Sequence, residues 1–566
     1  MDNFPDEFRE QLDLAIQIRR EALVPIFTER EKRILGRVFS NTDKNTYFIY
    51  GLPEELVTTL LARYSRIKNP RGLRGLFLDD FVTNIPIIGK IFTDPEGFLK
   101  EYGEVENRPG VRIVDIPVEE LEKLMGMGFS LGYYGSVVTI QKIKEFLTKF
   151  LDAYGHNSIA RMGIVHLALE NISILAAKTV EWARPGAGYI ELSTRFVDMR
   201  AKELYPAWRF FTSYYRKAES IEKHAMACMG AYEDLYPVCV VHFEREFAHL
   251  DPSKAAITGK VCDSLGNLLP CSTLTSLGVS MMGEAYQSVV RHLIADANPE
   301  CAALAFEIIE EAKKVGNRIL LGNHYMPGAT DHIQYQFWIR DYPNSSQEIR
   351  PDVFVKRDYL VPNALALESI IKMSGANIDA TFLEARNLFN DLGKRNSGHE
   401  SYEKLPDWFE HASGIFSGLM SFRSWRDLQR MGFCTHKRGW VTPNLGMYLP
   451  PDMPQEFIEK YSELHLCERF LCDSDLTTSM YGFRMLAQYA YMVGNFVPYI
   501  VGANLREWEF VNWQRTKWGV NEEVRKVVLR TEEFLRYEYP WWERISRADT
   551  TWEYVFARGP KAIPKK

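Results

Sequence analysis

The sequence Tyr154-Gly155-His156-Asn157-Ser158 opens one apolar stretch, and Ser397-Gly398-His399-Glu400-Ser401 opens another in the second half of the chain. The interval between them is far longer than the roughly 20–50 residues of a solenoid repeat, so a duplicated domain is the simpler interpretation. We therefore predict two tandem domains: residues 1–345, which include an N-terminal extension, and residues 346–566. The polar, turn-forming run Asp341–Ser346 is the expected boundary.

The apolar stretch after each copy of this motif predicts a buried helix. After the first copy, the apolar positions that recur at helical spacing are Ile164, Ala168, Ile172, Leu175 and Thr179. This helix is expected to end before Pro185, because residues 183–188 contain one proline and two glycines. After the second copy, Phe416–Arg430 predicts a comparable helix that ends at Gly432.

The remaining segments mix strands with helices, and helices are in the majority. A strand over Thr46–Tyr50 and a helix over Pro53–Tyr64 are expected in the first half. Asp352–Leu360 and Ala364–Met373 repeat this order in the second half. Two more segments, residues 201–247 and Pro299–Val315, have strongly helical compositions. The predicted class is therefore α+β and helix-rich.

The composition is that of an ordinary globular protein and narrows the classes of partner. Of the 566 residues, 46% are hydrophobic and 25% are charged, and the formal net charge is -6. Because proteins that bind nucleic acid usually carry a basic face, no nucleic-acid partner is expected. The N-terminus lacks the pattern of a signal peptide. Met485–Leu505 has no formal charge, but it contains Gln488, Asn495 and Pro498. We interpret it as buried core rather than a membrane span, and expect a soluble, cytoplasmic protein.

The eight cysteines are scattered without a Cys-x-x-Cys pair, which is typical of reduced thiols rather than of a disulfide framework. His465, Cys467 and Cys472 lie close together in the sequence but have no marked fourth ligand. We therefore interpret these thiols as structural and predict no metal site.

Glu191, Ser193 and Arg195 alternate along a short segment, so in an extended chain their side chains would share one face. An arginine fork and a hydroxyl both donate to phosphate oxygens, and a neighbouring carboxylate suits a sugar hydroxyl. The alternative is a Glu–Arg pair on the surface of an edge strand.

A second cluster, Asn504, Arg506 and Arg515, follows the uncharged Met485–Leu505 stretch. Arginines beside a buried segment need partners or a ligand. The alternative is that they cap the segment and extend outward to solvent.

Together these residues resemble the flavin-dependent thymidylate synthases. The second half of that family's signature falls on Glu191, Ser193, Arg195 and Phe196. The upstream Gly-His-x-Ser falls on residues 155–158 and again on residues 398–401. A later Asn-x-Arg followed by a further arginine falls on Asn504, Arg506 and Arg515. The resemblance implies two tandem α/β domains of the family that form a pseudo-dimer within one chain.

The chain departs from the family at its Arg-His-Arg triplet. Ala183-Arg184-Pro185 stands in its place in the first copy, and Arg430-Met431-Gly432 in the second. The losses are complementary, since the first copy keeps Glu191, Ser193 and Arg195 while the second keeps Arg430 and the Asn504 cluster. Family members are homotetramers with sites between subunits. The resemblance therefore implies one composite site built from both copies, and a homodimer of the fused chain.

The resemblance also implies roles for these residues. The substrate would be dUMP, with Ser193 and Arg195 on the phosphate, Glu191 near the sugar and Arg430 as a further contact. Arg515 would face the uracil and stabilise negative charge developing on its ring oxygen, so that Arg515 and Ser193 are the candidate catalytic residues. The residues implied to hold FAD are His156, Ser158, His399, Arg430, Asn504 and Arg506. NADPH and methylenetetrahydrofolate would be cosubstrates.

Two alternatives remain open from the sequence. One is an enzyme that binds flavin and a pyrimidine nucleotide but transfers a different group, which the altered triplet would permit. The other is a nucleotide-binding pseudoenzyme with a regulatory role. The histidines His156 and His399 are equally consistent with hydrogen-bonded core positions. Cys434, beside Thr435-His436-Lys437-Arg438, is the one thiol with basic neighbours in the sequence.

Overall fold

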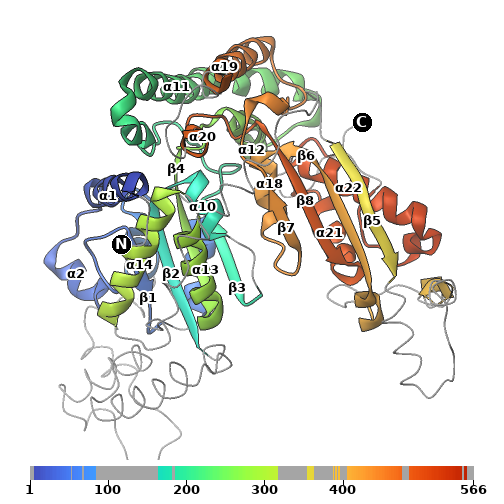
Figure 1. Cartoon of the computed structure of the whole chain (residues 1–566), viewed down its shortest axis with the longest axis horizontal. Helices are drawn as coiled ribbons and strands as arrows, with labels where there is room; N and C mark the ends of the chain where they lie inside the picture. The colour runs from blue at the N-terminus through green and yellow to red at the C-terminus, as the bar shows by residue number, and fades with distance from the viewer. Residues whose placement is uncertain are drawn as a thin grey trace, which may run out of the picture. The chain divides into compact units, whose positions relative to one another are not determined.

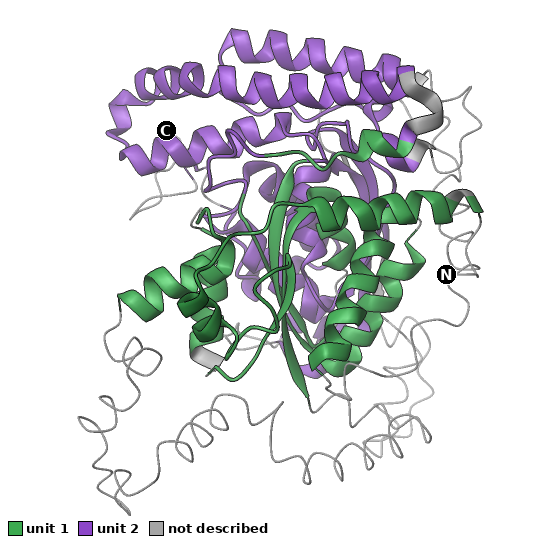
Figure 2. Cartoon of the chain, turned by 90° about the vertical axis from the view of Figure 1, so that its left-hand side faces the viewer, with its two compact units in different colours: residues 1–193, 203–210, 273–339 green, residues 194–202, 211–272, 340–566 purple. Residues whose placement is uncertain are grey.

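A computed structural model of the chain divides into two compact units, drawn in green and purple in Figure 2. Unit 1 comprises residues 1–193, 203–210 and 273–339, and unit 2 comprises residues 194–202, 211–272 and 340–566. The structure describes residues 6–52, 54–66, 69–84, 163–181, 185–296, 298–315, 354–362, 387, 389–391, 393–394, 405–473, 483–550 and 554–556.

Unit 1 contains a four-stranded antiparallel sheet (Figure 1). In spatial order its strands are β1 (Thr46–Ile49), β2 (Ile164–Ser173), β4 (Leu274–Met282) and β3 (Ala187–Glu191). The inner strands β2 and β4 are buried along most of their length. The helices of this unit are α1 (Asp6–Glu21), α2 (Glu29–Leu35), α3 (Glu54–Tyr64), α4 (Gly72–Leu76), the π-helix η1 (Phe77–Thr83), α10 (Ile174–Val180), α13 (Gly283–Ala295) and α14 (Pro299–Val315).

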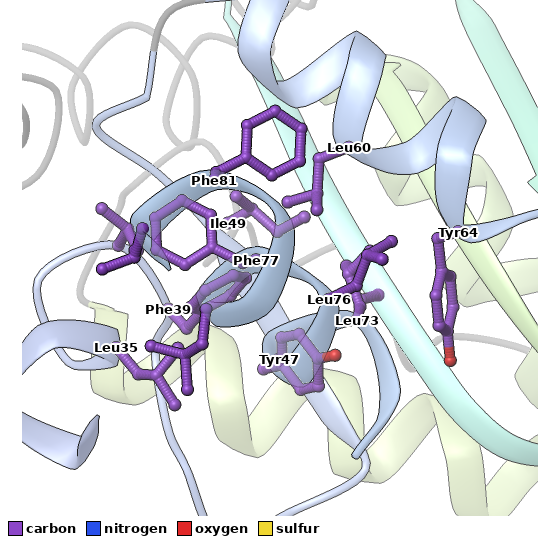
Figure 3. Close-up of a cluster of buried hydrophobic side chains, with 14 of the residues drawn as sticks. Leu35, Phe39, Tyr47, Ile49, Leu60, Tyr64, Leu73, Leu76, Phe77 and Phe81 are labelled. Atoms are coloured by element: carbon purple, nitrogen blue, oxygen red, sulfur yellow. The ribbon is translucent and has the colours of Figure 1, made fainter. Parts of the chain in front are cut away.

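An aromatic core anchors β1 to the helices that follow it (Figure 3). The Phe39 ring meets the Tyr47 ring edge-on at 5.5 Å and the Phe77 ring at 5.6 Å, a geometry that aromatic pairs prefer. The buried Arg74 guanidinium lies 4.2 Å from the centre of the Tyr47 ring. These rings and Leu60 belong to one buried cluster, and their burial holds β1 at the edge of the sheet.

Unit 2 contains a second antiparallel sheet with the corresponding strand order. Its strands are β5 (Phe354–Pro362), β6 (Ala412–Ser421), β8 (Phe496–Asn504) and β7 (Thr435–Arg438). Its helices are α11 (Tyr215–Glu246), α12 (Lys254–Leu265), α18 (Phe422–Gln429), α19 (Gln455–Asp473), α20 (Phe483–Ala487), α21 (Leu505–Thr516) and α22 (Glu522–Glu538). The short 3₁₀ turns of this unit are η5 (Ala248–Leu250), η6 (Gly266–Leu268), η7 (Asp407–His411), η8 (Pro443–Leu445) and η10 (Pro540–Arg544), while η4 (Ala207–Tyr214) begins in unit 1 and ends in unit 2.

The same contact, which we call the serine–glutamate clamp, joins strand to helix in each unit. In unit 1, Ser173 ends β2 and caps α10, and Glu300 accepts from its backbone N–H at 2.8 Å and its hydroxyl at 2.6 Å. In unit 2, Ser421 ends β6 and caps α18, and Glu523 accepts the same two bonds at 2.6 and 2.5 Å. Both pairs are buried, so each clamp satisfies donors that would otherwise be costly.

The two helices predicted after the Gly-His-x-Ser motifs are wrong in their N-terminal parts, whereas the C-terminal part of each is helical. Residues 164–173 and 412–421 form the strands β2 and β6, and only Ile174–Val180 and Phe422–Gln429 are helical. Both strands lie inside their sheets. An inner strand can be apolar on both faces, and a spacing of four residues is also a multiple of the strand period, so periodicity alone does not separate the two cases.

Other elements agree with prediction. The β1 strand and α3 match their predicted segments, and α14 has the predicted bounds. The long α11 covers the greater part of the predicted segment 201–247, and β5 overlaps the predicted strand. Together with the two sheets, they confirm a helix-rich α+β fold. The expected helix Ala364–Met373, the boundary Asp341–Ser346 and both Gly-His-x-Ser motifs lie outside the described residues.

The uncharged stretch Met485–Leu505 contributes the end of α20, the whole of β8 and the start of α21. Most of its residues are buried in the core, as predicted. In the part of the chain that the structure describes, no helix combines the length and apolarity needed to cross a membrane.

Candidate functional site

Arg195 lies in unit 2, because the segment from Thr194 to Lys202 packs there rather than with unit 1. Its Nε donates to Asp263 Oδ1 on α12 at 3.1 Å, and its Nη2 donates to the Gly519 carbonyl at 3.0 Å. Its Nη1 is 4.0 Å from Asp427 Oδ2 on α18. The guanidinium is thus held by a carboxylate and a carbonyl on different segments of the same unit.

Arg430 and Arg515 both place positive charge near a second carboxylate, that of Asp427. Arg430, at the C-terminal end of α18, donates to Asp427. Arg515, in the last turn of α21, donates through Nη2 to Met431 Sδ at 3.3 Å. Burial opposes ionisation of Asp427, but the positive charges of Arg430, Arg515 and Arg195 hold its pKa well below the usual value.

The surroundings of Arg515 disfavour its charged form. Burial lowers the pKa of its guanidinium, and repulsion from Arg430 and Arg195 lowers it further, while Asp427 acts in the opposite direction. An additional negative charge bound here would relieve that repulsion. The three arginines therefore form a region that is electrostatically prepared for an anion.

Arg423 completes the arrangement from the first turn of α18. Its Nη1 donates to Asp263 Oδ1 at 2.9 Å, and Asn521 Nδ2 donates to the same oxygen at 3.0 Å. Despite burial, the charges of Arg195 and Arg423 lower the pKa of Asp263. Gly266 allows the guanidinium to approach, since a Cβ at that position would lie 2.7 Å from Arg423 Nε.

We call this set the arginine cluster; its members are Arg195, Arg423, Arg430, Arg515, Asp263 and Asp427. Four guanidinium groups and two carboxylates leave a formal excess of two positive charges among them. Guanidinium forks bind phosphate oxygens bidentately, and the two carboxylates fix the direction of the forks. The cluster thus suits a dianionic phosphate monoester.

Sequence reasoning identified Arg195, Arg430 and Arg515 but missed Asp263, Asp427 and Arg423. No motif marks these three residues, because Asp263 contacts Arg195 and Arg423, and Asp427 contacts Arg195, across long stretches of the sequence. The sequence signal that was available for Asp427 is its position three residues before Arg430, which places both on one side of a helical turn.

Glu191 does not join the arginine cluster. It lies in unit 1, where Lys178 Nζ is 2.5 Å from its Oε2 and also pairs with Glu181. All three side chains are buried. The expectation that Glu191, Ser193 and Arg195 share one face of a strand is wrong, because β3 ends at Glu191 and residues 194–196 form a turn.

Ser193 lies between these two arrangements in the sequence. Its backbone N–H donates to the Ser65 carbonyl at 3.0 Å, which takes the chain out of the sheet after β3. The side chain is half-buried. Its role on the phosphate stays a prediction, as does that of Glu191 near the sugar.

Asn504 and Arg506 lie at the opposite end of α21 from Arg515. Asn504 caps the helix by accepting from the Glu507 N–H at 2.8 Å, and Arg506 Nη1 is 2.5 Å from Glu410 Oε1. At about 1.5 Å of rise per residue, Arg506 and Arg515 are separated by roughly 14 Å along the helix. Asn504 is thus the N-terminal cap of α21, and the roles of Asn504 and Arg506 on flavin stay predictions.

The remaining predicted ligands, His156, Ser158 and His399, lie outside the described residues. Cys434 is buried, and burial raises the pKa of its thiol well above the usual value. A thiol of this kind stays protonated near neutral pH, so Cys434 is not an activated nucleophile.

A small cavity adjoins the arginine cluster in unit 2. It shares Asp263 and Asn521 with the cluster's surroundings and is also lined by the aromatic rings of Tyr448, Trp518 and Tyr554. Its volume of about 40 Å³ accommodates a few water molecules rather than a nucleotide base. The cavity therefore does not serve as the base pocket in this conformation.

Comparison with known proteins connects this geometry to a family. Residues 123–316 match the family model described as thymidylate synthase complementing protein. The predicted family resemblance is confirmed. The match covers one continuous segment, about a third of the chain, which includes Arg195 and Asp263 of the arginine cluster. Duplication of this domain along the chain stays a prediction.

Three relatives span most of the chain, and each carries the name UPF0159 protein. The protein from Chlamydia pneumoniae is 28% identical over 464 residues, which is 77% of this chain and 79% of the relative. That from Chlamydia muridarum is 25% identical over 465 residues, 76% of this chain and 79% of the relative. That from Thermoplasma acidophilum is 22% identical over 474 residues, 74% of this chain and 91% of the relative.

Solved structures of a UMP/dUMP methylase, PolB from Streptomyces cacaoi, also show similarity. The form bound with 5-Br dUMP has 13% sequence identity and a TM-score of 0.27, and covers 36% of this chain and 99% of that one. The form bound with 5-Br UMP has 15% identity and a TM-score of 0.26, and covers 35% and 98%. Superposition at this level establishes no correspondence between individual residues.

Proposed function

We propose that this protein is a thymidylate synthase-like enzyme that methylates dUMP, and that the arginine cluster of unit 2 binds the phosphate of the nucleotide. The observation that carries the proposal is the convergence of Arg195, Arg430 and Arg515 on Asp427. These arginines come from opposite halves of the sequence, and each falls on a position of the family signature. The family match over residues 123–316 supports the same substrate class.

In this proposal the residues of the cluster divide the work. Arg195 and Arg430 hold the phosphate oxygens, and Asp263 and Asp427 keep their forks in position. Ser193 donates its hydroxyl to the same phosphate. Arg515 faces the uracil, where its positive charge stabilises negative charge that develops on the ring oxygen during attack at carbon-5. Burial and the charges of Arg430 and Arg195 lower the pKa of Arg515, so a bound anion would stabilise its charged form.

A flavin fits the other end of α21 in one respect. Arg506 has a side chain that is 28% exposed and lies in the first turn of that helix, and a helix N-terminus with an arginine favours phosphate groups. Arg506 and Asn504 would hold one part of FAD there, and Arg430, in the arginine cluster, would contact another part of it. When bound and reduced, the flavin would supply the hydride for the transferred carbon.

The rest of the proposed reaction follows from the family resemblance. Methylenetetrahydrofolate would donate the one-carbon unit and NADPH would reduce the flavin. The protein would act in the cytoplasm as a homodimer, and both copies of the motif would contribute to one composite site. Rescue of a thymidine auxotroph by the intact gene, with loss of rescue for the Arg515→Ala variant, is the expected biological result.

Nucleotide binding tests the composite site directly. Arg195→Ala and Arg515→Ala are each expected to weaken dUMP binding by about 30-fold or more in isothermal titration calorimetry, because each removes a charge-assisted contact worth about 2 kcal/mol. Arg200→Ala is the matched control, since Arg200 lies in the same segment but forms an exposed pair with Asp198. Loss of binding for Arg195→Ala with unchanged binding for Arg515→Ala would refute the composite site.

The flavin part of the proposal has a separate test. We expect purified protein, or protein reconstituted with FAD, to show a flavin absorbance spectrum that NADPH bleaches. Protein that binds dUMP but takes up no FAD would instead indicate a nucleotide-binding pseudoenzyme. Protein that is reduced by NADPH yet fails to rescue the auxotroph would indicate a different transferred group.

A further inference from the structure

Three potential metal ligands meet in the interior of unit 2, away from the arginine cluster. His224 and Cys228 lie one helical turn apart on α11, and Glu468 lies on α19. His224 Nε2 is 3.2 Å from Glu468 Oε1 and 3.3 Å from Cys228 Sγ, and all three atoms lie within 4.8 Å of one another. All three side chains are buried, and α11 packs against α19.

The surroundings of Glu468 raise a charge problem. Its carboxylate accepts from the Met492 N–H at 2.5 Å and from Asn495 Nδ2 at 2.7 Å. The carboxylate is buried, and a buried carboxylate needs a cation or hydrogen-bond donors around it. Among the described residues, the basic side chains within 4.0 Å of it are those of His224 and His465.

We propose that His224 Nε2, Cys228 Sγ and Glu468 Oε1 bind one divalent transition-metal ion, with Zn²⁺ as the best fit. Bonds of about 2.0–2.1 Å to nitrogen, 2.3 Å to sulfur and 2.0–2.2 Å to oxygen give tetrahedral edges of roughly 3.3–3.6 Å. The 3.2 and 3.3 Å separations of His224 from its partners are close to those edges. Spacing of four residues on one helix places both α11 ligands on the same face.

The charges balance when a metal is bound. On binding, the Cys228 thiol releases its proton to solvent and His224 binds through a neutral nitrogen. One thiolate and one carboxylate then neutralise the divalent ion, which suits a site buried from solvent. Glu468 keeps its bonds to Met492 and Asn495, and these bonds orient the carboxylate. The fourth position is left for a water molecule.

The competing interpretation is a metal-free ion pair. In it, a protonated His224 donates to Glu468 while Cys228 stays a thiol, since burial raises the pKa of that thiol. Both interpretations join α11 to α19. They differ in whether the protein takes up a metal and whether the sulfur is a thiolate.

Cobalt substitution distinguishes them with the whole chain. Protein treated with a chelator and titrated with Co²⁺ is expected to bind one ion per chain and to develop a thiolate-to-cobalt charge-transfer band. The Cys228→Ser variant is expected to lose that band and to bind Co²⁺ at least tenfold more weakly. Cys239→Ser, at a buried position on the same helix, and Cys467→Ser, beside Glu468, are controls that should keep the band.

The result does not depend on how well the variants fold. If the intact protein binds no Co²⁺, or binds it without a thiolate band, the proposal is wrong and the ion pair is correct. A charge-transfer band that persists in Cys228→Ser would also overturn the assignment. So would a band that disappears in a folded control variant. Elemental analysis of protein purified without chelator is expected to show about one zinc per chain.

Discussion

The two units share a strand order and a serine–glutamate clamp, yet they treat charge differently beside the clamp. In unit 1, Lys178 follows the clamp serine and is enclosed by Glu181 and Glu191. In unit 2, the helix after the clamp serine instead carries members of the arginine cluster, where guanidinium groups outnumber carboxylates. Beside the clamp, Lys178, Glu181 and Glu191 together carry excess negative charge in unit 1. The arginine cluster carries excess positive charge in unit 2.

This difference indicates a division of labour. An enclosed lysine between two carboxylates leaves no donor for an anionic ligand, whereas the arginine cluster gains from one. We therefore expect unit 1 to use its buried charges for the stability of the fold, and unit 2 to use them for binding. Each prediction below would break or sharpen that comparison.

The largest effect is expected for Lys178→Met in unit 1. This change removes the Lys178 ammonium from two buried carboxylates, those of Glu181 and Glu191, which is expected to cost about 3–5 kcal/mol of unfolding free energy. Urea denaturation would measure it. dUMP affinity of the protein that remains folded should be unchanged. A large loss of affinity without loss of stability would show that unit 1 also binds the nucleotide.

Asp263→Asn in unit 2 tests whether a carboxylate orients Arg195. The variant keeps the side-chain shape but weakens the bonds from Arg195 and Arg423. We expect about tenfold weaker dUMP binding by calorimetry, equivalent to about 1.4 kcal/mol. Asp198→Asn is the control, because Asp198 pairs with the exposed Arg200, which lies outside the arginine cluster. Unchanged affinity would limit Asp263 to a structural role.

The serine–glutamate clamps should be nearly equivalent. Ser173→Ala and Ser421→Ala each remove a helix cap and a bond to a buried glutamate, at a cost of about 1–2 kcal/mol. Ser253→Ala removes the N-terminal cap of α12, an exposed serine, and should lower the unfolding free energy by about 1 kcal/mol or less. Thermal unfolding would measure all three. A clear difference between the two clamp variants would show that the two clamps contribute unequally to the stability of the protein.

Arg506→Ala should have the smallest effect on stability. Its pair with Glu410 is partly exposed, and such pairs contribute about 0–1 kcal/mol. Because Arg506 is far along α21 from Arg515, dUMP affinity should stay within about twofold of the original. Weaker FAD uptake by this variant, measured by flavin fluorescence, would support the proposed role of Arg506; dUMP affinity lowered as strongly as in Arg515→Ala would contradict the separation of the two ends.

Local sequence signals predicted those elements whose patterns allow one interpretation. The bounds of α14 follow from a proline at its first position and a long amphipathic run, and α3 from its acidic first turn and apolar spacing. The apolar runs that became β2 and β6 fit both a helix and a buried strand. Their choice depends on neighbours in the sheet, such as the pairing of Ala168 with Gly278, which no local pattern contains.

The sequence by itself determined the helix-rich α+β class and the family resemblance, and it marked Arg195, Arg430 and Arg515 as candidates, because short motifs and composition are properties of neighbouring residues. Only the tertiary structure decided which charges meet. It paired Glu191 with Lys178, and it brought Arg195 close to Asp427 although these two residues are 232 positions apart in the sequence. Electrostatic interactions act over a few ångströms in space, so the fold, rather than the order of residues, selects the partners.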